Sequence, residues 1–140
     1  MAPTVIVHLR AMVLALSFLS TLPTPKLRHI DSAVQAASML WYPLVGVLLG
    51  WLLTCVAPLL PGPWYFHAGL LTLLWVALTG GLHLDGLADC ADAWLGGLGD
   101  RERTLELLKD PLSGTMAVLA LVLVVLLKVL AVAALLEASA

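Results

Sequence analysis

Residues 116–136 consist almost entirely of Leu, Val and Ala, and the only charged side chain among them is Lys128. A run of this kind can cross a bilayer as a helix, because about 20 apolar residues span the hydrocarbon core. The rest of the chain is similar, since 61% of its 140 residues are hydrophobic and 11% are charged. A typical soluble domain has about 25% charged residues. The sequence therefore predicts an integral membrane protein.

Three further apolar segments precede this run. Residues 39–60 and 64–84 are each long enough to span a bilayer. Residues 5–22 are marginal in length, so we expect a short spanning helix or a re-entrant one. The predicted fold class is an all-α, polytopic membrane protein with about three to four transmembrane helices, in which residues 1–140 form a single membrane domain.

Charge is concentrated in the polar segment 85–110, which carries seven of the nine acidic side chains. Two short helices are predicted here, one over 82–95 and one over 101–109 with Asp100 as its N-cap. The formal net charge of −2 gives no basis for nucleic-acid binding. Two of the connections between the apolar segments carry Lys and Arg. One precedes 39–60 and the other follows 64–84, and their basic residues are Lys26, Arg28, Arg101, Arg103 and Lys109. The positive-inside rule then predicts that the polar segment is cytoplasmic.

The run 80–92 reads GGLHLDGLADCAD. Its aspartates Asp85, Asp89 and Asp92 fall at roughly 0°, 40° and −20° on a helix with about 100° per residue, so they share one face. Carboxylates this close repel one another, and a divalent cation with oxygen ligands relieves that repulsion. We therefore expect all three to bind Mg²⁺ and to serve phosphoryl chemistry. A solvated acidic helix face is the alternative.

The second polar helix offers further candidates. Glu106 and Asp110 are spaced i, i+4 with Lys109 beside them. They are expected to complete a second metal site or to bind phosphate, and an ordinary solvated face with a Glu106–Lys109 pair is the alternative.

Polar and small residues near the membrane segments are the remaining candidates. Lys128 is costly in mid-span, so a partner carboxylate or a substrate phosphate is expected to compensate it, and a purely structural pair is the alternative. Gly80 and Gly81 allow a bend or a close backbone approach. His83 is expected either to pack and hydrogen-bond or to take part in catalysis. As a group, these four residues and Lys109 are the predicted substrate-binding set.

The run 80–92 closely resembles the hallmark of the cobalamin synthase family, adenosylcobinamide-GDP ribazoletransferase. The resemblance extends through Arg101, Lys109 and Lys128, and upstream to PLVG at 43–46. It implies a polytopic enzyme of the bacterial cytoplasmic (inner) membrane that acts late in vitamin B12 biosynthesis. Such enzymes use Mg²⁺ to join α-ribazole, or its 5′-phosphate, to adenosylcobinamide-GDP, giving adenosylcobalamin or its phosphate plus GMP. On this resemblance, Asp85, Asp89 and Asp92 are the metal and diphosphate site.

The chain also departs from the family pattern. Thr21 stands where the family usually has Arg, Ala93 replaces a usual Gly, and 111–113 replaces a stretch that usually contains Ser and Arg. Family members are longer, so the chain is expected to be the N-terminal part of the pattern, with a homo-oligomer or a second chain supplying further helices. The alternatives are an inactive or incomplete family fragment, a CDP-alcohol phosphotransferase, and a segment of a cation or proton transporter.

Overall fold

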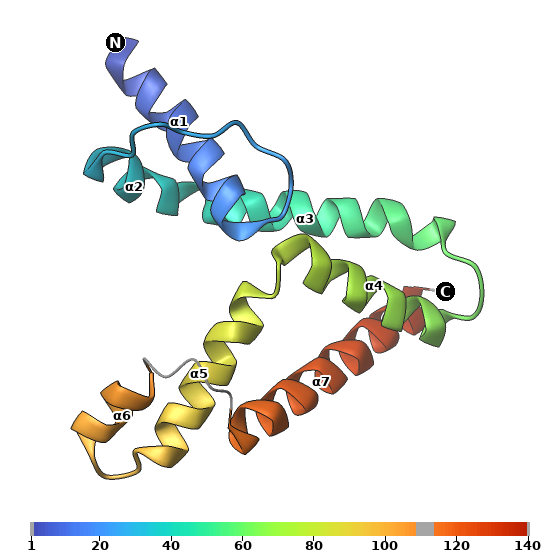
Figure 1. The fold of residues 1–140 in the computed structure, drawn as a ribbon. Coiled ribbons are helices and arrows are strands. Elements are labelled where there is room, and N and C mark those ends of the chain that lie inside the picture. The colour runs from blue at the N-terminus through green and yellow to red at the C-terminus, as the bar shows by residue number, and fades with distance from the viewer. Residues whose placement is uncertain (1, 109–113, 140) are drawn as a thin grey trace. The chain divides into compact units, whose positions relative to one another are not determined.

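The computed structural model describes residues 2–108 and 114–139. The described chain is helical, which confirms the all-α class (Figure 1). It divides into two compact units, and each is described by itself. The first comprises Met1–Pro61 and Leu73–Gly80, and the second comprises Gly62–Thr72 and Gly81–Ala140. The predicted single membrane domain stays a prediction.

The first unit is built on helix α1, which packs against α2 and α3. The helical elements of this part of the chain are α1 (Ala2–Leu19), α2 (Ser32–Ser38), η1 (Met39–Trp41), α3 (Tyr42–Val56) and η2 (Ala57–Leu59). Its small core consists of Ala15, Val45 and Leu49, all at most 6% exposed. The elements from α2 to η2 follow one another without a break, so the helical run begins earlier than the predicted residue 39. The small, partly polar side chains of 32–38 conceal this extension from a hydropathy reading.

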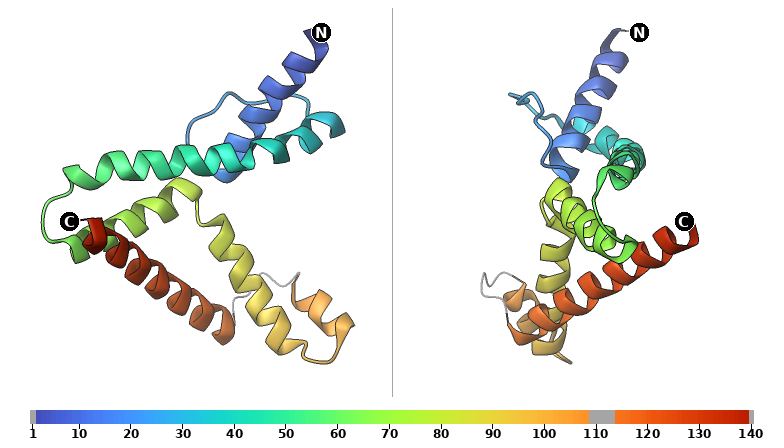
Figure 2. Two further views of the ribbon diagram at one scale, coloured as in Figure 1. Left: turned by 180° about the vertical axis from the view of Figure 1, so that it is seen from behind. Right: turned by 90° about the vertical axis from the view of Figure 1, so that its right-hand side faces the viewer.

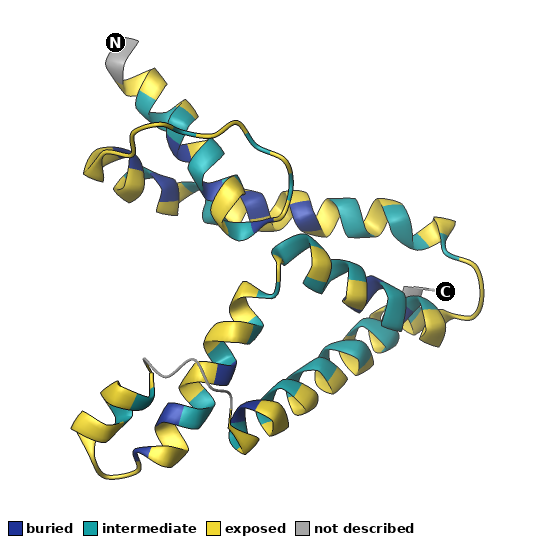
Figure 3. Cartoon of the chain, viewed as in Figure 1, coloured by how far each residue is buried: buried dark blue, intermediate teal, exposed yellow. Residues whose placement is uncertain are grey.

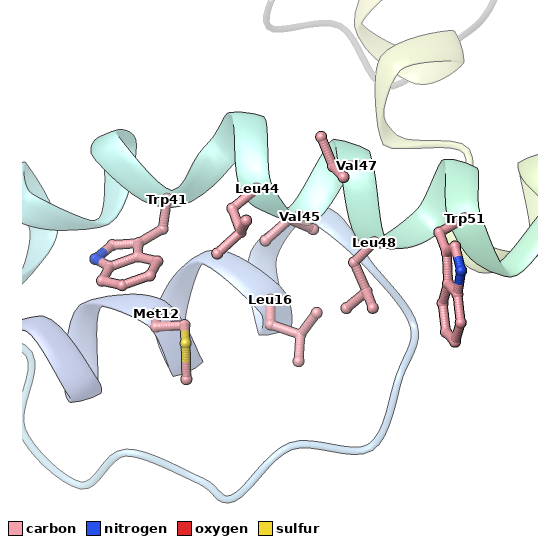
Figure 4. Close-up of a pocket in the computed structure, with 8 residues that line it drawn as sticks. All are labelled: Met12, Leu16, Trp41, Leu44, Val45, Val47, Leu48 and Trp51. Carbon is pink, nitrogen blue, oxygen red and sulfur yellow. The ribbon is translucent and has the colours of Figure 1, made fainter.

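An apolar groove lies between α1 and α3 in the first unit (Figure 4). Its volume is about 450 Å³. The residues that line it are Met12, Leu16, Trp41, Leu44, Val45, Val47, Leu48 and Trp51. No charged side chain is among them, which suits a surface that faces lipid.

Helix α4 (Trp64–Thr79) ends at Gly80 and Gly81, and α5 (Leu82–Gly96) begins directly after them. Both glycines are left-handed, with φ of 63° and 69°, a conformation that costs other L-residues about 1–2 kcal/mol. The predicted interruption at these glycines is confirmed. Thr21 holds the end of α4, because its backbone N–H donates to the Leu78 carbonyl at 2.8 Å and its Oγ1 donates to the Ala77 carbonyl at 2.9 Å.

In the second unit, α5 packs against both α6 (Arg101–Leu107) and α7 (Thr115–Ser139). Figures 1 and 2 show the beginning of α7 beside α5, while α6 folds back at the far end of α5. Asp100 caps α6, since its carboxylate accepts from the backbone N–H groups of Glu102 at 2.9 Å and Arg103 at 3.2 Å. Both predicted polar helices are thus confirmed within the described residues.

Two helical runs are long and apolar enough to cross a membrane, Ser32–Leu59 and Thr115–Ala138. A third crossing results if the bent pair α4 and α5 counts as one span. In the second run, none of the most apolar 18 residues is buried, and Figure 3 colours α7 as exposed or half-buried except near its beginning. The predicted count was about three to four spans, and three is reached when the bent pair is included. Within the described chain, Thr4–Leu19 is apolar but too short to be counted as one.

Candidate active site

Helix α5 carries the three predicted aspartates on one unbroken stretch of helix. At the beginning of α5, the Gly81 carbonyl accepts hydrogen bonds from the backbone N–H groups of Leu84 at 2.8 Å and Asp85 at 2.9 Å. Asp85 lies in the first turn, where a negative charge is favoured by the helix dipole. Because the helix continues to Gly96, the i, i+4, i+7 spacing places all three carboxylates along one face.

Two of these aspartates are open to the surroundings. Asp85 and Asp89 are both exposed and lie one helical turn apart. Mg²⁺ is usually held by one or two carboxylates together with substrate phosphates and water, so the donor chemistry of this pair fits that ion. Its oxygens also match the hard-ligand preference of Mg²⁺ over softer metals.

The third aspartate is engaged elsewhere. Asp92 is half-buried, and its Oδ1 accepts from the backbone N–H of Ala117 at 2.8 Å. Its Oδ2 accepts from the backbone N–H of Gly114. Both donors lie at the beginning of α7. Within residues 2–108 and 114–139, no group of three or more His, Cys, Asp or Glu side chains is arranged to hold a metal ion. The three-aspartate metal site therefore stays a prediction.

Lys128 and His83 meet between α7 and α5. The Lys128 Nζ lies 2.6 Å from the His83 Nε2. Lys has only donors, so Nε2 accepts and the imidazole proton lies on Nδ1. The two predicted substrate-binding residues are thus brought together.

Helix α6 positions Glu106, which is exposed. Thr104 lies at the contact with the end of α5, where its hydroxyl shares one proton between the Asp100 carbonyl at 2.8 Å and the Gly97 carbonyl at 3.1 Å. The Nε of Arg103 also donates to the Gly96 carbonyl at 3.1 Å. The other two candidates of this helix, Lys109 and Asp110, lie outside the described residues.

The backbone amides of Gly114 and Ala117 are functional groups that the sequence reasoning did not identify. A signal was present, because Gly114 lies two residues before the apolar run and has no side-chain acceptor to cap a helix that begins there. The first N–H groups of such a helix must bond to another part of the chain or to water. Nothing local identifies Asp92, which is 22 residues away along the chain.

Comparison with known proteins gives a consistent result. The sequence pattern of the family described as cobalamin-5-phosphate synthase matches residues 11–140. The adenosylcobinamide-GDP ribazoletransferase of Pseudomonas fluorescens is 56% identical over 125 residues, which are 89% of this chain and 51% of that protein. The Pseudomonas aeruginosa protein of the same name is 57% identical over 130 residues, 91% of this chain and 53% of that protein. The chain thus spans about half the length of these curated relatives. No solved structure matches.

Proposed function

Because the chain belongs to the cobalamin-5-phosphate synthase family, we propose that it forms the part of an adenosylcobinamide-GDP ribazoletransferase that carries the diphosphate site. The observation that supports this most is the exposed pair Asp85 and Asp89 on a helix beside an apolar span, within a region 57% identical to such a transferase. The family assignment sets aside a CDP-alcohol phosphotransferase and a transporter segment.

The proposed reaction is a phosphoryl substitution at the diphosphate of adenosylcobinamide-GDP. A ribose hydroxyl of α-ribazole other than the 5′-hydroxyl, which is free in the 5′-phosphate form as well, attacks the cobinamide-linked phosphorus through its oxygen. The new P–O bond forms as the P–O bond to GMP breaks, and the hydroxyl proton passes to water. The products are adenosylcobalamin, or its phosphate, and GMP.

The residues of α5 supply the proposed metal site. Asp85 and Asp89 would hold Mg²⁺, and a bound Mg²⁺ would neutralise negative charge on the diphosphate and on the leaving GMP. Only with that cation bound would these two carboxylates hold the anionic end of the substrate near the beginning of α5, because carboxylates alone repel it. Asp92, Glu106 and Asp110 are the other predicted ligands.

Basic and small residues form the proposed substrate contacts. Lys128, paired with His83, would bring positive charge toward an anionic substrate group, and Lys109 would do so from the polar segment. The backbone at Gly81 leaves space beside the beginning of α5, since no heavy atom apart from its chain neighbours lies within 4 Å of a Cβ built there, whereas a Cβ at Gly80 would lie 3.2 Å from Cγ2 of Thr21.

We also propose where the chain resides and what it binds. The bias of Lys and Arg in its connections supports a multi-pass protein of the bacterial cytoplasmic membrane with residues 85–110 on the cytoplasmic side. Adenosylcobinamide-GDP, α-ribazole and the lipid bilayer are the proposed partners. A homo-oligomer or a second chain would supply further helices.

The test is metal-dependent release of GMP. The purified chain in lipid nanodiscs is incubated with adenosylcobinamide-GDP and α-ribazole, with and without Mg²⁺. A parallel sample also contains the region of the Pseudomonas aeruginosa relative that this chain does not span. We expect GMP and corrinoid product in at least one sample, and only with Mg²⁺. Absence of product in both, with folded protein and intact substrates, contradicts the proposal.

Two aspartate substitutions separate the proposed site from general charge effects. Asp89→Asn should lower the rate about 100-fold or more, as removal of a transition-state stabilising group commonly does. Asp100→Asn removes the same charge from the polar segment but keeps an N-cap acceptor for α6, so it should leave the rate unchanged. Equal losses in both variants would show that the effect is not specific to α5.

A further inference from the structure

The beginning of α7 is capped from another helix. Its first backbone N–H groups have no partner within the helix, and the preceding residue, Gly114, has no side chain to accept from them. Asp92 of α5 supplies the acceptors instead: Oδ1 for the Ala117 N–H at 2.8 Å and Oδ2 for the Gly114 N–H. Ala117 is the third residue of α7, the position that an N-cap side chain ordinarily serves.

The space around Gly114 shows that this contact is closely fitted. A Cβ at Gly114 would lie 2.8 Å from Oδ1 and 3.0 Å from Cγ of Asp92. A Cβ at this position would therefore force the carboxylate to shift. Ala117 is 0% exposed, so its N–H needs a partner within the protein. The negative charge of Asp92 is also favoured at the positive end of the α7 dipole.

Asp92 shares a helix face with Asp85 and Asp89, so its contact with α7 sets where that helix begins relative to the other two carboxylates. We propose that Asp92 is a positioning residue. It caps α7 from α5 and holds the beginning of α7 beside Asp85 and Asp89, and it does not serve as a third metal ligand. The metal part of this inference rests on the proposed function, and the capping part does not.

A double-mutant cycle tests the cap on the full chain in detergent micelles, with unfolding by SDS as the measurement. Asp92→Ala should lower the folding equilibrium constant about tenfold, the usual effect of losing an N-cap. Gly114→Ala should do the same, because the added Cβ displaces the carboxylate. In the Asp92→Ala background, however, Gly114→Ala should change the constant less than about twofold. Additive losses would overturn the capping contact.

Conservative substitution provides a second measure of the cap. Asp92→Asn keeps one oxygen acceptor, enough for the Ala117 N–H, but its amide NH2 cannot accept from the Gly114 N–H. This variant should therefore recover part, but not all, of the folding equilibrium constant that Asp92→Ala loses. No recovery at all would contradict the hydrogen bond to Ala117 as part of the cap.

Metal binding is measured separately, with Mn²⁺ as a paramagnetic replacement for Mg²⁺. Electron paramagnetic resonance of free Mn²⁺ gives its Kd for the chain in nanodiscs without any need for turnover. Asp89→Asn should raise this Kd about tenfold or more, whereas Asp92→Asn should stay within about threefold of the parent chain. An equal rise in both variants would overturn the distinction and return Asp92 to the metal site. If the parent chain binds no Mn²⁺, the proposed function fails at its metal site while the double-mutant cycle still decides the cap.

Discussion

Replacement of Gly97 by Ala should undock α6 from the end of α5. A Cβ at this position would lie 2.6 Å from the Cα and 2.7 Å from the backbone N of Thr104. Carbon atoms in good contact are about 3.5–4.0 Å apart, so an approach this close is strongly repulsive. Both atoms belong to the backbone, so no change of side-chain rotamer relieves the clash. Helix α6 must move by about an ångström.

The free-energy change has three parts. Overpacking of this kind costs about 1–3 kcal/mol. Loss of the Thr104 hydrogen bond to the Gly97 carbonyl adds only about 0.5 kcal/mol, because the hydroxyl keeps its bond to the Asp100 carbonyl at 2.8 Å. The φ of Gly97 is −103°, which Ala adopts without strain. Ala also lowers the conformational entropy of the unfolded chain, which stabilises the folded state by about 0.4–1 kcal/mol and offsets part of the cost. Gly97→Ala should therefore weaken the docking of α6 on α5 by about 1–3 kcal/mol.

Hydrogen–deuterium exchange of the full chain in nanodiscs measures this cost directly. Amides of α6 should lose protection by a factor of about 5–150, which corresponds to the same range of free energy. Gly86→Ala is the matched control, because nothing lies within 4 Å of a Cβ there and α5 should gain about 0.5–1 kcal/mol. Thr104→Ala removes the hydroxyl without a clash and should cost only about 1 kcal/mol. Unchanged α6 protection in Gly97→Ala would refute the reasoning.

Two further predictions concern ties between distant parts of the sequence. Thr21→Val keeps the shape of the side chain but removes the donor to the Ala77 carbonyl, so it should lower the free energy of unfolding by about 1 kcal/mol in SDS titrations; no change would show that the tie is not formed. Lys128→Leu should make insertion of α7 more favourable by roughly 3 kcal/mol in a glycosylation-mapping assay. The same variant should lower GMP release, and full turnover would assign the Lys128–His83 pair a purely structural role.

The helices of the polar region could be predicted because their ends depend on local chemistry. Asp100 caps α6 by accepting from backbone N–H groups two and three residues further along. Gly80 and Gly81 end α4 because their backbone has positive φ angles. The same local logic missed the beginning of the first long helical run at Ser32, because small polar residues carry little hydropathy signal. It gave the correct class of fold and the correct face for the aspartates.

The contacts between helices could not be predicted in this way. Asp92 bonds to an amide 25 residues further along, and His83 meets a lysine 45 residues further along. Both depend on how α5 and α7 pack, and the apolar side chains of α7 are spread around all sides of the helix, so their pattern alone does not indicate which face meets α5. A reading by spacing alone therefore treated Asp92 as equivalent to Asp85 and Asp89.

The uniform surface of α7 explains why polar contacts matter for its position. Lipid tails are as apolar as Leu and Val, so the hydrophobic effect gives α7 no reason to prefer α5 over the bilayer. Close packing at small residues and interhelical hydrogen bonds must select the register, and both occur here: Ala88 of α5 is 5% exposed and Ala117 of α7 is 0% exposed. The bonds made by Asp92 and His83 then fix α7 along α5 at two separate levels. A carboxylate that performs this task would be required on the aspartate face even if Asp85 and Asp89 alone bound the metal.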